Sequence, residues 1–342
     1  MRSAFARPPA PRTTVTARIS VVIPCRNGAE FLGEALESVR RQTLSPDEVI
    51  VVDDRSTDAS AAVARAHGAT VLRTTEPGGT AVARNLGWRH ARGELIAFLD
   101  ADDRWRPRHL ELVPALLAQH PNAVLAFGSI ELFGLMSGRC PNHIMADSRP
   151  VDARAFAATI CPVPQTTAVI PRRELVALAG FDETLKAVED FDLFARLAHR
   201  GPFVGCYDVT GEYRQHAHQT TRFRRRQVIM EYVLVTGRSV DALRGTLSAE
   251  EIEGLDAQRL RYWDDVLRDL WRGGDREAFD MLLGMSRHVP GSVARLQHWR
   301  LLRAIGWPAW KAVLGIARML KLRRLWNLAR DTMFGRQRAA RP

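Results

Sequence analysis

Short apolar runs alternate with amphipathic segments through the first 130 residues of the chain. The runs rich in Val, Ile, Leu and Phe, which are typical of strands buried on both faces, lie at 19–23, 48–52, 70–72, 95–99 and 123–127. Apolar residues recur at helical spacing in the intervening segments 31–39, 59–66, 83–91 and 107–119. Regular alternation of strand and helix is the pattern of βαβ units, in which the strands are parallel. We therefore expect an α/β fold with a mostly parallel, three-layer sheet.

The pattern loosens after this alternation. A polar stretch at 134–165 shows no clear period and is long enough to form a lid or an acceptor-side loop. A strand is expected at 166–170, followed by helices at 173–179 and 193–199. The α/β part of the chain should therefore end near residue 222.

From about Phe223 onward the pattern is nearly all helical. Ser248 and Glu251 form the sequence signature of a capping box at a helix start, and Gly273-Gly274 predicts a break. We expect this segment to be a helical appendage to the α/β domain. The expected parts of the chain are a disordered N-terminus at 1–17, the α/β domain at 18–222, a helical region at 223–298 and a helical tail at 299–342.

The composition fits a globular protein that works in a reducing compartment. The chain has 342 residues, of which 46% are hydrophobic, so it is long enough to bury a full core. Its four cysteines are widely spaced without a C-x-x-C pair, so neither a zinc site nor a disulfide framework is indicated. The sequence has no run of about 18 uninterrupted apolar residues and no signal-peptide core. We therefore expect a cytoplasmic protein without a membrane-spanning segment.

Positive charge is concentrated in the C-terminal tail. Of the net charge of +11, the tail at 299–342 carries +10, with eleven Lys and Arg against the single acid Asp331. Four of the eight tryptophans lie there too. Trp beside Lys and Arg is typical of a segment on an anionic membrane surface, although Lys321 and Arg324 interrupt the apolar stripe. We expect peripheral membrane binding. A helical cap packed on the protein itself is the alternative, and nucleic-acid binding is not favoured.

Acidic residues directly follow two of the expected strands. The run LIAFLDADDRW places Asp100, Asp102 and Asp103 after a buried strand, and the second strand ends in Asp53-Asp54. Open α/β sheets bind ligands at the carboxyl ends of their strands. Carboxylates this close repel one another unless a cation neutralises them, and oxygen ligands suit Mg²⁺ or Mn²⁺. The pattern predicts a metal site, with helix capping by Asp102 or Asp103 as the alternative.

A Gly78-Gly79 turn and an Arg84-Asn85 pair lie between the two acidic strand ends. Such a set suits a nucleotide. One carboxylate accepts from a base imide or ribose hydroxyls, another pair holds a metal that bridges the diphosphate, and an Arg steadies base or phosphate. A nicotinamide oxidoreductase would share the βαβ units, but Pro-Cys-Arg-Asn-Gly follows the first strand where that class has G-x-G-x-x-G. The sequence therefore favours a nucleotide site of another class.

Four segments resemble, in order and spacing, the motifs of the family 2 glycosyltransferases with a GT-A fold. They are VVIPCRNGAEFL, VIVVDDRSTD, GGTAVARNLGWRHARGELIAFLDADD and GFDETLKAVEDFDLFARL, and the match covers roughly residues 18–220. The resemblance implies an inverting transfer from a nucleotide-sugar donor, with a UDP-sugar favoured, that depends on Mn²⁺ or Mg²⁺. With the basic tail, the expected acceptor is a glycan or lipid-linked glycan of the cell envelope. The alternative is a catalytically silent nucleotide-binding scaffold that docks on a membrane or partner by its tail.

The resemblance also implies roles for residues of the donor pocket. Asp54 would contact the nucleobase, and Pro24, Asn27 and Arg84 would line the nucleotide pocket. One departure is Arg55, which stands where Gly is usual in the family's D-D-G-S-T-D pattern. This difference bears on loop conformation more than on chemistry.

The same resemblance places a metal site in the D-x-D motif. Asp102 would be the firmer metal ligand, and Asp100 would be shared between ribose and metal. The segment Tyr213-Arg214-Gln215-His216 resembles a family segment in which Arg214 would meet the diphosphate and His216 would approach the metal. The alternative for His216 is a packing or surface role, which is commoner for a single histidine.

Asp190 looks like the general base of the family. An inverting transfer needs one carboxylate to deprotonate the acceptor hydroxyl on the face opposite the leaving diphosphate. Glu189 and Asp192 compete for this role, and both would otherwise be N-terminal acids that favour the dipole of the following helix.

Overall fold

The chain divides into two compact units, one made of residues 1–156 and 160–235 and the other of 157–159 and 236–342. The structure, a computed structural model, describes residues 16–135, 137–139, 152–154, 163–217, 225–286, 292 and 296–305. The expectations for residues 1–15, for most of the polar stretch at 134–165 and for the tail beyond 305 lie outside the described residues. They stay predictions.

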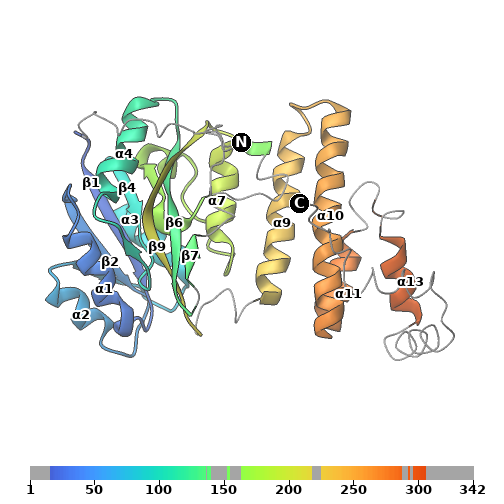
Figure 1. The fold of residues 1–342 in the computed structure, drawn as a ribbon, viewed down its shortest axis with the longest axis horizontal. Helices are drawn as coiled ribbons and strands as arrows, with labels where there is room; N and C mark the ends of the chain where they lie inside the picture. Colours follow the sequence, from blue (N-terminus) through green and yellow to red (C-terminus); the bar gives the residue numbers. More distant parts are fainter. Residues whose placement is uncertain are drawn as a thin grey trace, which may run out of the picture. The chain divides into compact units, whose positions relative to one another are not determined.

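In the described part of the first unit, nine strands form a mostly parallel sheet at its centre (Figure 1). Its strands are β1 Ile19–Cys25, β2 Glu48–Asp53, β3 Thr70–Arg73, β4 Leu95–Phe98, β5 Arg104–Trp105, β6 Leu125–Gly134, β7 Gly138–Arg139, β8 Val169–Pro171 and β9 Phe203–Gln215. They are ordered β3-β2-β1-β4-β8-β6-β9-β5, with β7 paired to β6. Strands β3, β2, β1 and β4 are parallel, whereas β8 is antiparallel to both of its neighbours. The carboxyl ends of β2 and β4 therefore flank the end of β1.

Helices cover both faces of this sheet. They are α1 Ala29–Arg40, α2 Ser60–Ala66, α3 Thr80–His90, α4 His109–Gln119, α6 Arg172–Ala177 and α7 Glu189–Ala198. Val21 and Ile23 of β1 belong to the core cluster that also holds the apolar sides of α1, α2 and α4. On the opposite face, Gly87 brings α3 so close to Val22 and Val52 that a Cβ there would collide with Val22. The three-layer α/β fold expected from the sequence is confirmed.

Strand β9 adds to the sequence analysis, which assigned no element to residues 200–222. It pairs in parallel with β6, and the register shifts between Gly128 and Ser129 and again before Ile130. The sequence FVGCYDVTGEYRQ lacks a clean alternation, because Gly205 and Gly211 interrupt it and the bulge changes which side chains share a face. Periodicity alone could not reveal this strand.

Several element boundaries also differ from the expectation, for example the end of β6, which lies at Gly134 rather than at 127. Residues 165–167 form a 3-10 turn, so strand β8 begins at Val169 rather than at 166. Helix α7 begins at Glu189, four residues before the expected start at 193. The early start places all three acids of the Glu189-Asp190-x-Asp192 segment in the first helical turn.

The second unit is helical. Helix α9 Arg225–Leu243 begins in the first unit and continues past Val235 into the second, where α10 Ala249–Gly273, α11 Arg276–Met285 and α13 Gln297–Ile305 follow. The capping box is confirmed, because the side chains and backbones of Ser248 and Glu251 bond reciprocally. The expected break is confirmed as well, since Gly274 ends α10 in the left-handed conformation with φ 74°.

Trp299, the first residue of the expected tail, is buried within this helical unit. Its indole Nε1 donates a hydrogen bond of 2.6 Å to Asp264, and its ring packs against Trp271 and Phe279. Trp299 therefore stabilises the packed helices. Trp299 itself is therefore not available to a membrane surface.

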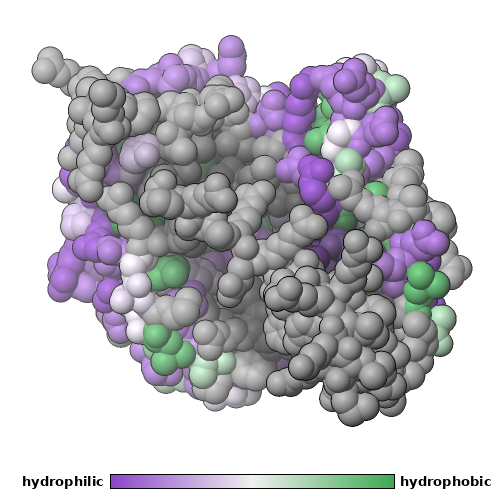
Figure 2. Space-filling model, turned by 45° about the vertical axis from the view of Figure 1, so that its right-hand side comes forward, coloured by the Kyte–Doolittle hydropathy of each residue, from purple (hydrophilic) through white to green (hydrophobic). Residues whose placement is uncertain are grey.

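The described surface is mainly hydrophilic on the face that Figure 2 shows, with small hydrophobic spots. The large hydrophobic side chains exposed among the described residues are Leu135, Val176, Tyr207, Leu234, Met281 and Leu301. They are spread over six different segments. Among the described helices, none combines the length and the apolar character needed to cross a bilayer.

Candidate active site

Asp54, directly after β2, holds the turn that starts helix α3. Its Oδ1 accepts hydrogen bonds from the Gly78 amide and the Thr74 hydroxyl, both at 2.8 Å, and its Oδ2 accepts one from the Gly79 amide at 2.9 Å. Gly79 is the N-cap of α3 and has φ 90°, a conformation that favours glycine. The exposed Arg26 guanidinium lies 3.8 Å from Oδ2. Since a carboxylate oxygen can accept two hydrogen bonds, Oδ2 keeps capacity for a ligand N–H.

Asn27 joins the loop after β1 to the loop after β2. Its side-chain Oδ1 accepts from the Thr57 amide at 2.8 Å, and its own amide donates to Ser56 Oγ at 2.9 Å. Both Asn27 and Arg55 have positive φ values, 51° and 60°. The residue that departs from the family pattern therefore occupies the backbone conformation that a glycine adopts most easily. Pro24 is buried at the end of β1 beside these loops.

Arg84 of α3 joins the end of β4 to the start of α7. Its Nη2 donates to Asp100 Oδ1 at 2.6 Å, and its Nη1 donates to Glu189 Oε1 at 2.8 Å. The arginine side chain is only 4% exposed, so these ion pairs are shielded from water. The two carboxylates keep Arg84 cationic and raise its pKa. One buried guanidinium thereby orders two acidic segments that lie far apart in the sequence.

Three acids lie in the first turn of α7. Asp190 is the one for which the described contacts include no ion pair with an arginine. Its competitors are engaged: Glu189 binds Arg84, and Asp192 binds Arg196 at 2.8 Å. Asp190 Oδ1 accepts a hydrogen bond from the Phe191 amide. Burial and the neighbouring charge of Glu189 raise the pKa of Asp190 to about 6, against the opposing effect of Arg84. A carboxylate with this pKa is suited to accept a proton near neutral pH.

Asp102 and His216 lie side by side, with 2.9 Å between Asp102 Oδ2 and His216 Nε2. The pKa of Asp102 is raised by burial and by the charge of Asp100. The two carboxylates of the D-x-D motif are therefore close enough to repel each other, which a divalent cation would relieve. The structure thus brings Asp102 into contact with His216 and leaves Asp100 close enough for its charge to raise the pKa of Asp102.

These residues fit a metal that completes its coordination with the substrate. Within the described segments, no three or more His, Cys, Asp and Glu side chains already form a metal cluster. Mg²⁺ and similar ions in nucleotide sites are typically bound by one or two carboxylates, with phosphate oxygens and water as the other ligands. Asp100 and Asp102, with His216 as a third donor, match that arrangement.

Asp103 and Arg214 fix the loop that carries the D-x-D motif. The Arg214 amide donates to Asp103 Oδ1 and its Nε donates to the Asp102 carbonyl, both at 2.8 Å. The guanidinium also lies between the rings of Phe31 and Phe133, 4.5 and 4.4 Å from their centroids. Its Nη2 also donates to Glu34 Oε2 at 2.8 Å, and the diphosphate role that the sequence suggested for Arg214 stays a prediction.

The capping alternative for Asp102 and Asp103 is wrong. Helix α4 starts at His109 with Arg108 as its N-cap, and its cap makes no side-chain hydrogen bond. Asp103 is instead fully buried, and burial together with the charges of Asp102 and Asp100 raises its pKa well above the usual range. Sequence reasoning missed this role because the pattern of hydrophobic and polar positions does not show which of three neighbouring acids is buried.

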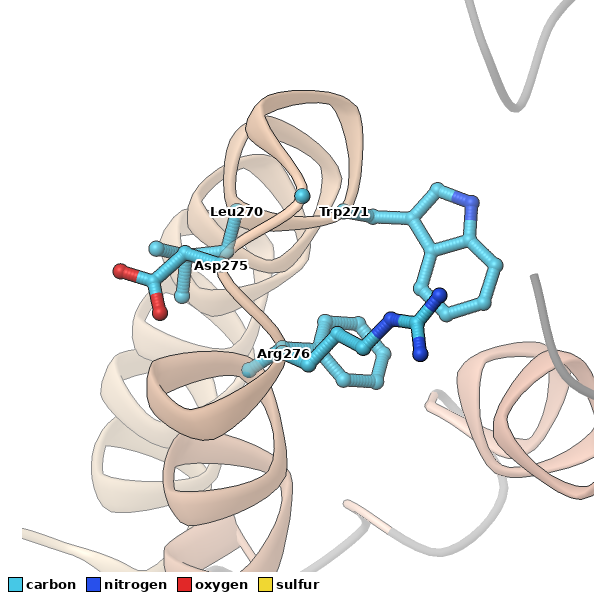
Figure 3. Close-up of a pocket in the computed structure, with 6 residues that line it drawn as sticks. Leu270, Trp271, Asp275 and Arg276 are labelled. Carbon is cyan, nitrogen blue, oxygen red and sulfur yellow. The ribbon is translucent and has the colours of Figure 1, made fainter.

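A small hollow in the second unit lies at the turn between α10 and α11 (Figure 3). Trp271 and Arg276 extend to the same side of this turn, and Asp275 extends away from them. Asp275 caps α11 by accepting from the Ala278 amide. The hollow has room for about one water molecule, so it is too small for a sugar nucleotide.

Comparison with known proteins identifies the class. Residues 20–173 match the sequence model of glycosyl transferase family 2. An uncharacterized glycosyltransferase of Rickettsia prowazekii is 26% identical over 274 residues, which cover 78% of this chain and 84% of the relative. The amylovoran biosynthesis glycosyltransferase AmsB of Erwinia amylovora is 29% identical over 219 residues, which cover 60% of this chain and 70% of the relative.

Two solved structures share the fold. The 1-349 fragment of S. aureus TarS in complex with UDP-GlcNAc superposes with a TM-score of 0.57 at 19% identity, covering 92% of this chain and 88% of that one. The mannosyltransferase PcManGT of Pyrobaculum calidifontis, in complex with GDP-Man and Mn²⁺, superposes with a TM-score of 0.55 at 21% identity, covering 98% of this chain and 89% of that one. The α/β domain therefore has the fold of the GT-A glycosyltransferases. The α/β domain of this chain belongs to glycosyl transferase family 2.

Proposed function

We propose that the protein is an inverting, metal-dependent glycosyltransferase that moves a sugar from a nucleotide-sugar donor to an acceptor hydroxyl. The observation that carries the proposal is the Arg84 bridge between Asp100 and Glu189, since it connects the D-x-D motif to the segment of the general base Asp190. A donor held at the D-x-D motif and an acceptor held beside Asp190 would meet across this bridge. An inverting transfer needs that opposition of leaving group and base.

A UDP-sugar is the favoured donor. Asp54 would accept the imide N–H of the base through Oδ2, next to the Gly78-Gly79 turn, and Pro24 and Asn27 would line the same pocket. Asp100 would bind the ribose. TarS, a structural neighbour, has been solved with UDP-GlcNAc and with UDP, which supports this choice.

Asp100, Asp102 and His216 would hold Mn²⁺ or Mg²⁺. A divalent ion stabilises negative charge on the leaving diphosphate. The mutual repulsion of the two carboxylates supports the assignment, as does the Mn²⁺ in the mannosyltransferase neighbour. Asp102 is the firmer of the two ligands, because Asp100 already binds Arg84.

Asp190 would accept the proton of the acceptor hydroxyl. Its raised pKa makes it a better proton acceptor than an ordinary aspartate, while Arg84 prevents a still larger rise. Glu189 and Asp192 hold their neighbours in place through ion pairs. No enzyme nucleophile is needed, because the acceptor oxygen attacks the sugar directly.

The acceptor we propose is a glycan or lipid-linked glycan of the cell envelope, and the protein would act at the cytoplasmic face of the membrane. The relative AmsB, which is named for amylovoran biosynthesis, supports a polysaccharide product. The basic residues that follow α13 would hold the protein on the anionic lipid surface.

A panel of UDP-, GDP- and dTDP-sugars tests the donor class by thermal shift with and without Mn²⁺. A bound donor raises the melting temperature by mass action. We expect a metal-dependent shift for UDP-sugars. A protein that is stabilised by no member of the panel would contradict the proposal.

A further inference from the structure

Helix α9 contacts the catalytic segment on both sides of Asp190. Glu231 of α9 binds backbone amides that precede Asp190, and Tyr232 stacks on Phe191, which follows it. Both contacts involve the part of α9 that belongs to the first unit, which extends to Val235. Two consecutive residues of one helix therefore bracket the proposed general base.

Glu231 receives hydrogen bonds from three consecutive amides. Its Oε2 accepts from Ala187 at 2.9 Å, from Lys186 at 3.1 Å and from Val188 at 3.2 Å, and its Oε1 accepts from Lys186 at 3.0 Å. The Gln227 side chain donates to the same Oε1 at 2.8 Å. Convergent amides of this kind form a concave anion site, and bonds to a charged carboxylate are stronger than neutral ones. The backbone ahead of α7 is thus fixed by a carboxylate from another helix.

Among the described contacts, the start of helix α7 lacks a capping side chain of its own. Its N-cap is Val188. The first turn instead carries Glu189, Asp190 and Asp192, whose like charges repel one another. The amides that Glu231 holds therefore contribute, with the Arg84–Glu189 ion pair, to fixing the direction in which this turn begins.

Tyr232 and Phe191 fix the other side of the turn. Their rings stack with centroids 4.3 Å apart and an interplanar angle of 15°. The Phe191 amide donates to Asp190 Oδ1 at 2.7 Å, so a displacement of Phe191 would move the carboxylate directly. Lys186 ties the same loop to the donor side, because its Nζ donates to the Gly78 carbonyl at 3.2 Å.

We propose that Glu231 is a positioning residue that sets the orientation of the Asp190 carboxylate by holding the amides of residues 186–188. The inference rests on the proposed function, in which Asp190 is the general base. Glu231 lies beyond residues 20–173, the segment that matches the family. Its effect should appear in turnover and leave donor binding intact, because it touches none of Asp54, Asp100 and Asp102.

The Glu231→Gln variant of the full chain tests this inference. We expect kcat for hydrolysis of UDP-GlcNAc or GDP-mannose, in which water takes the place of the acceptor and the nucleoside diphosphate is released, to fall by about 10- to 100-fold, as for other misplacements remote from the chemistry. The Kd for UDP with Mn²⁺ should stay within about twofold of the wild-type value. Glu250→Gln is the matched control, since Glu250 is exposed and should change neither quantity. Tyr232→Leu provides a second variant that perturbs the same turn without altering a charge, and we expect kcat to fall there too.

A double-mutant comparison separates positioning from a general loss of structure. If Glu231 acts through Asp190, adding Glu231→Gln to Asp190→Asn should lower kcat by less than about threefold further. The inference would be overturned if Glu231→Gln kept the kcat of the wild type, or if the double variant showed the full loss of both single variants. In either case, turnover by the wild-type chain would still support the proposed function. A wild-type protein that releases no nucleotide from either donor would overturn the proposed function, and this inference with it.

Discussion

The guanidinium of Arg84 lies 2.6 Å from the carboxylate of Asp100, and the same group binds Glu189 on its other side. Helix α3 thereby connects the acidic end of β4 to the first turn of α7. Because the guanidinium is buried, the ion pairs are strong only as a complete set, and the loss of the cation would leave two carboxylates without compensation. The architecture of the site depends on this one arginine.

Arg84→Met removes the cation while keeping much of the side-chain length. We expect the free energy of unfolding to fall by about 3 to 5 kcal/mol, the usual cost of breaking a buried ion pair from one side. Urea unfolding followed by circular dichroism measures the change. The double variant with Glu189→Gln should recover part of the loss, because one of the stranded charges is removed. A change of stability below about 0.5 kcal/mol in Arg84→Met would contradict this role.

Asp102→Asn keeps the shape of the side chain but removes a charged metal ligand. We expect the Mn²⁺-dependent part of UDP binding to weaken by about tenfold or more, since a hard cation prefers a carboxylate to an amide. Isothermal titration calorimetry with and without Mn²⁺ measures it. Asp265→Asn is a matched control at a side chain that is 71% exposed. If UDP binding depended on Mn²⁺ equally in Asp102→Asn and in the wild type, Asp102 would not be a metal ligand.

The raised pKa of Asp190 predicts a pH dependence for turnover. The base must be deprotonated to accept a proton, so kcat/KM should rise with pH through about 6 and then level off. Glu189→Gln removes a like charge and should lower the pKa of Asp190, which shifts the rising limb to lower pH. A pH profile of both proteins checks the sign, and a shift to higher pH in Glu189→Gln would contradict it.

Truncation after Ile305 tests the membrane proposal. Trp299 is buried among the helices of the second unit, so a deletion from residue 299 would damage that unit, whereas the residues after 305 keep nine Lys and Arg and one acid. Each basic residue near an anionic surface contributes about 1 kcal/mol, so the full chain should pellet with anionic vesicles and the truncated chain should not. Vesicles of neutral lipid are the control. Equal pelleting of both chains would show that the tail does not bind membrane.

Much of the fold could be predicted from the sequence, as could the positions of the acids at two strand ends. Buried strands produce continuous apolar runs, and the acids that follow β2 and β4 stand at fixed positions relative to those runs. Strand β9 was missed because its glycines and its register shifts against β6 remove the alternation on which such predictions depend.

The partners of the acids could not be predicted. Arg84 and Glu189 are 105 residues apart, and Glu231 lies more than 40 residues beyond the amides it binds. Such contacts follow from tertiary packing, which places α3 and α9 beside the start of α7, and no local pattern encodes them. The burial of Asp103 is of the same kind.

Hydrolysis of a UDP-sugar by the purified full chain, in which water accepts the sugar and UDP is released, is the most direct test of the central claim, that this domain is a metal-dependent glycosyltransferase with Asp190 as its base. The account predicts release in the presence of Mn²⁺, its loss with EDTA, and a reduction of about 100-fold or more in Asp190→Asn while UDP still binds. A wild-type chain that binds the donor but never releases nucleotide would contradict it and would favour a silent nucleotide-binding scaffold. If Asp190→Asn kept full turnover and Asp192→Asn were inactive, Asp190 would not be the base.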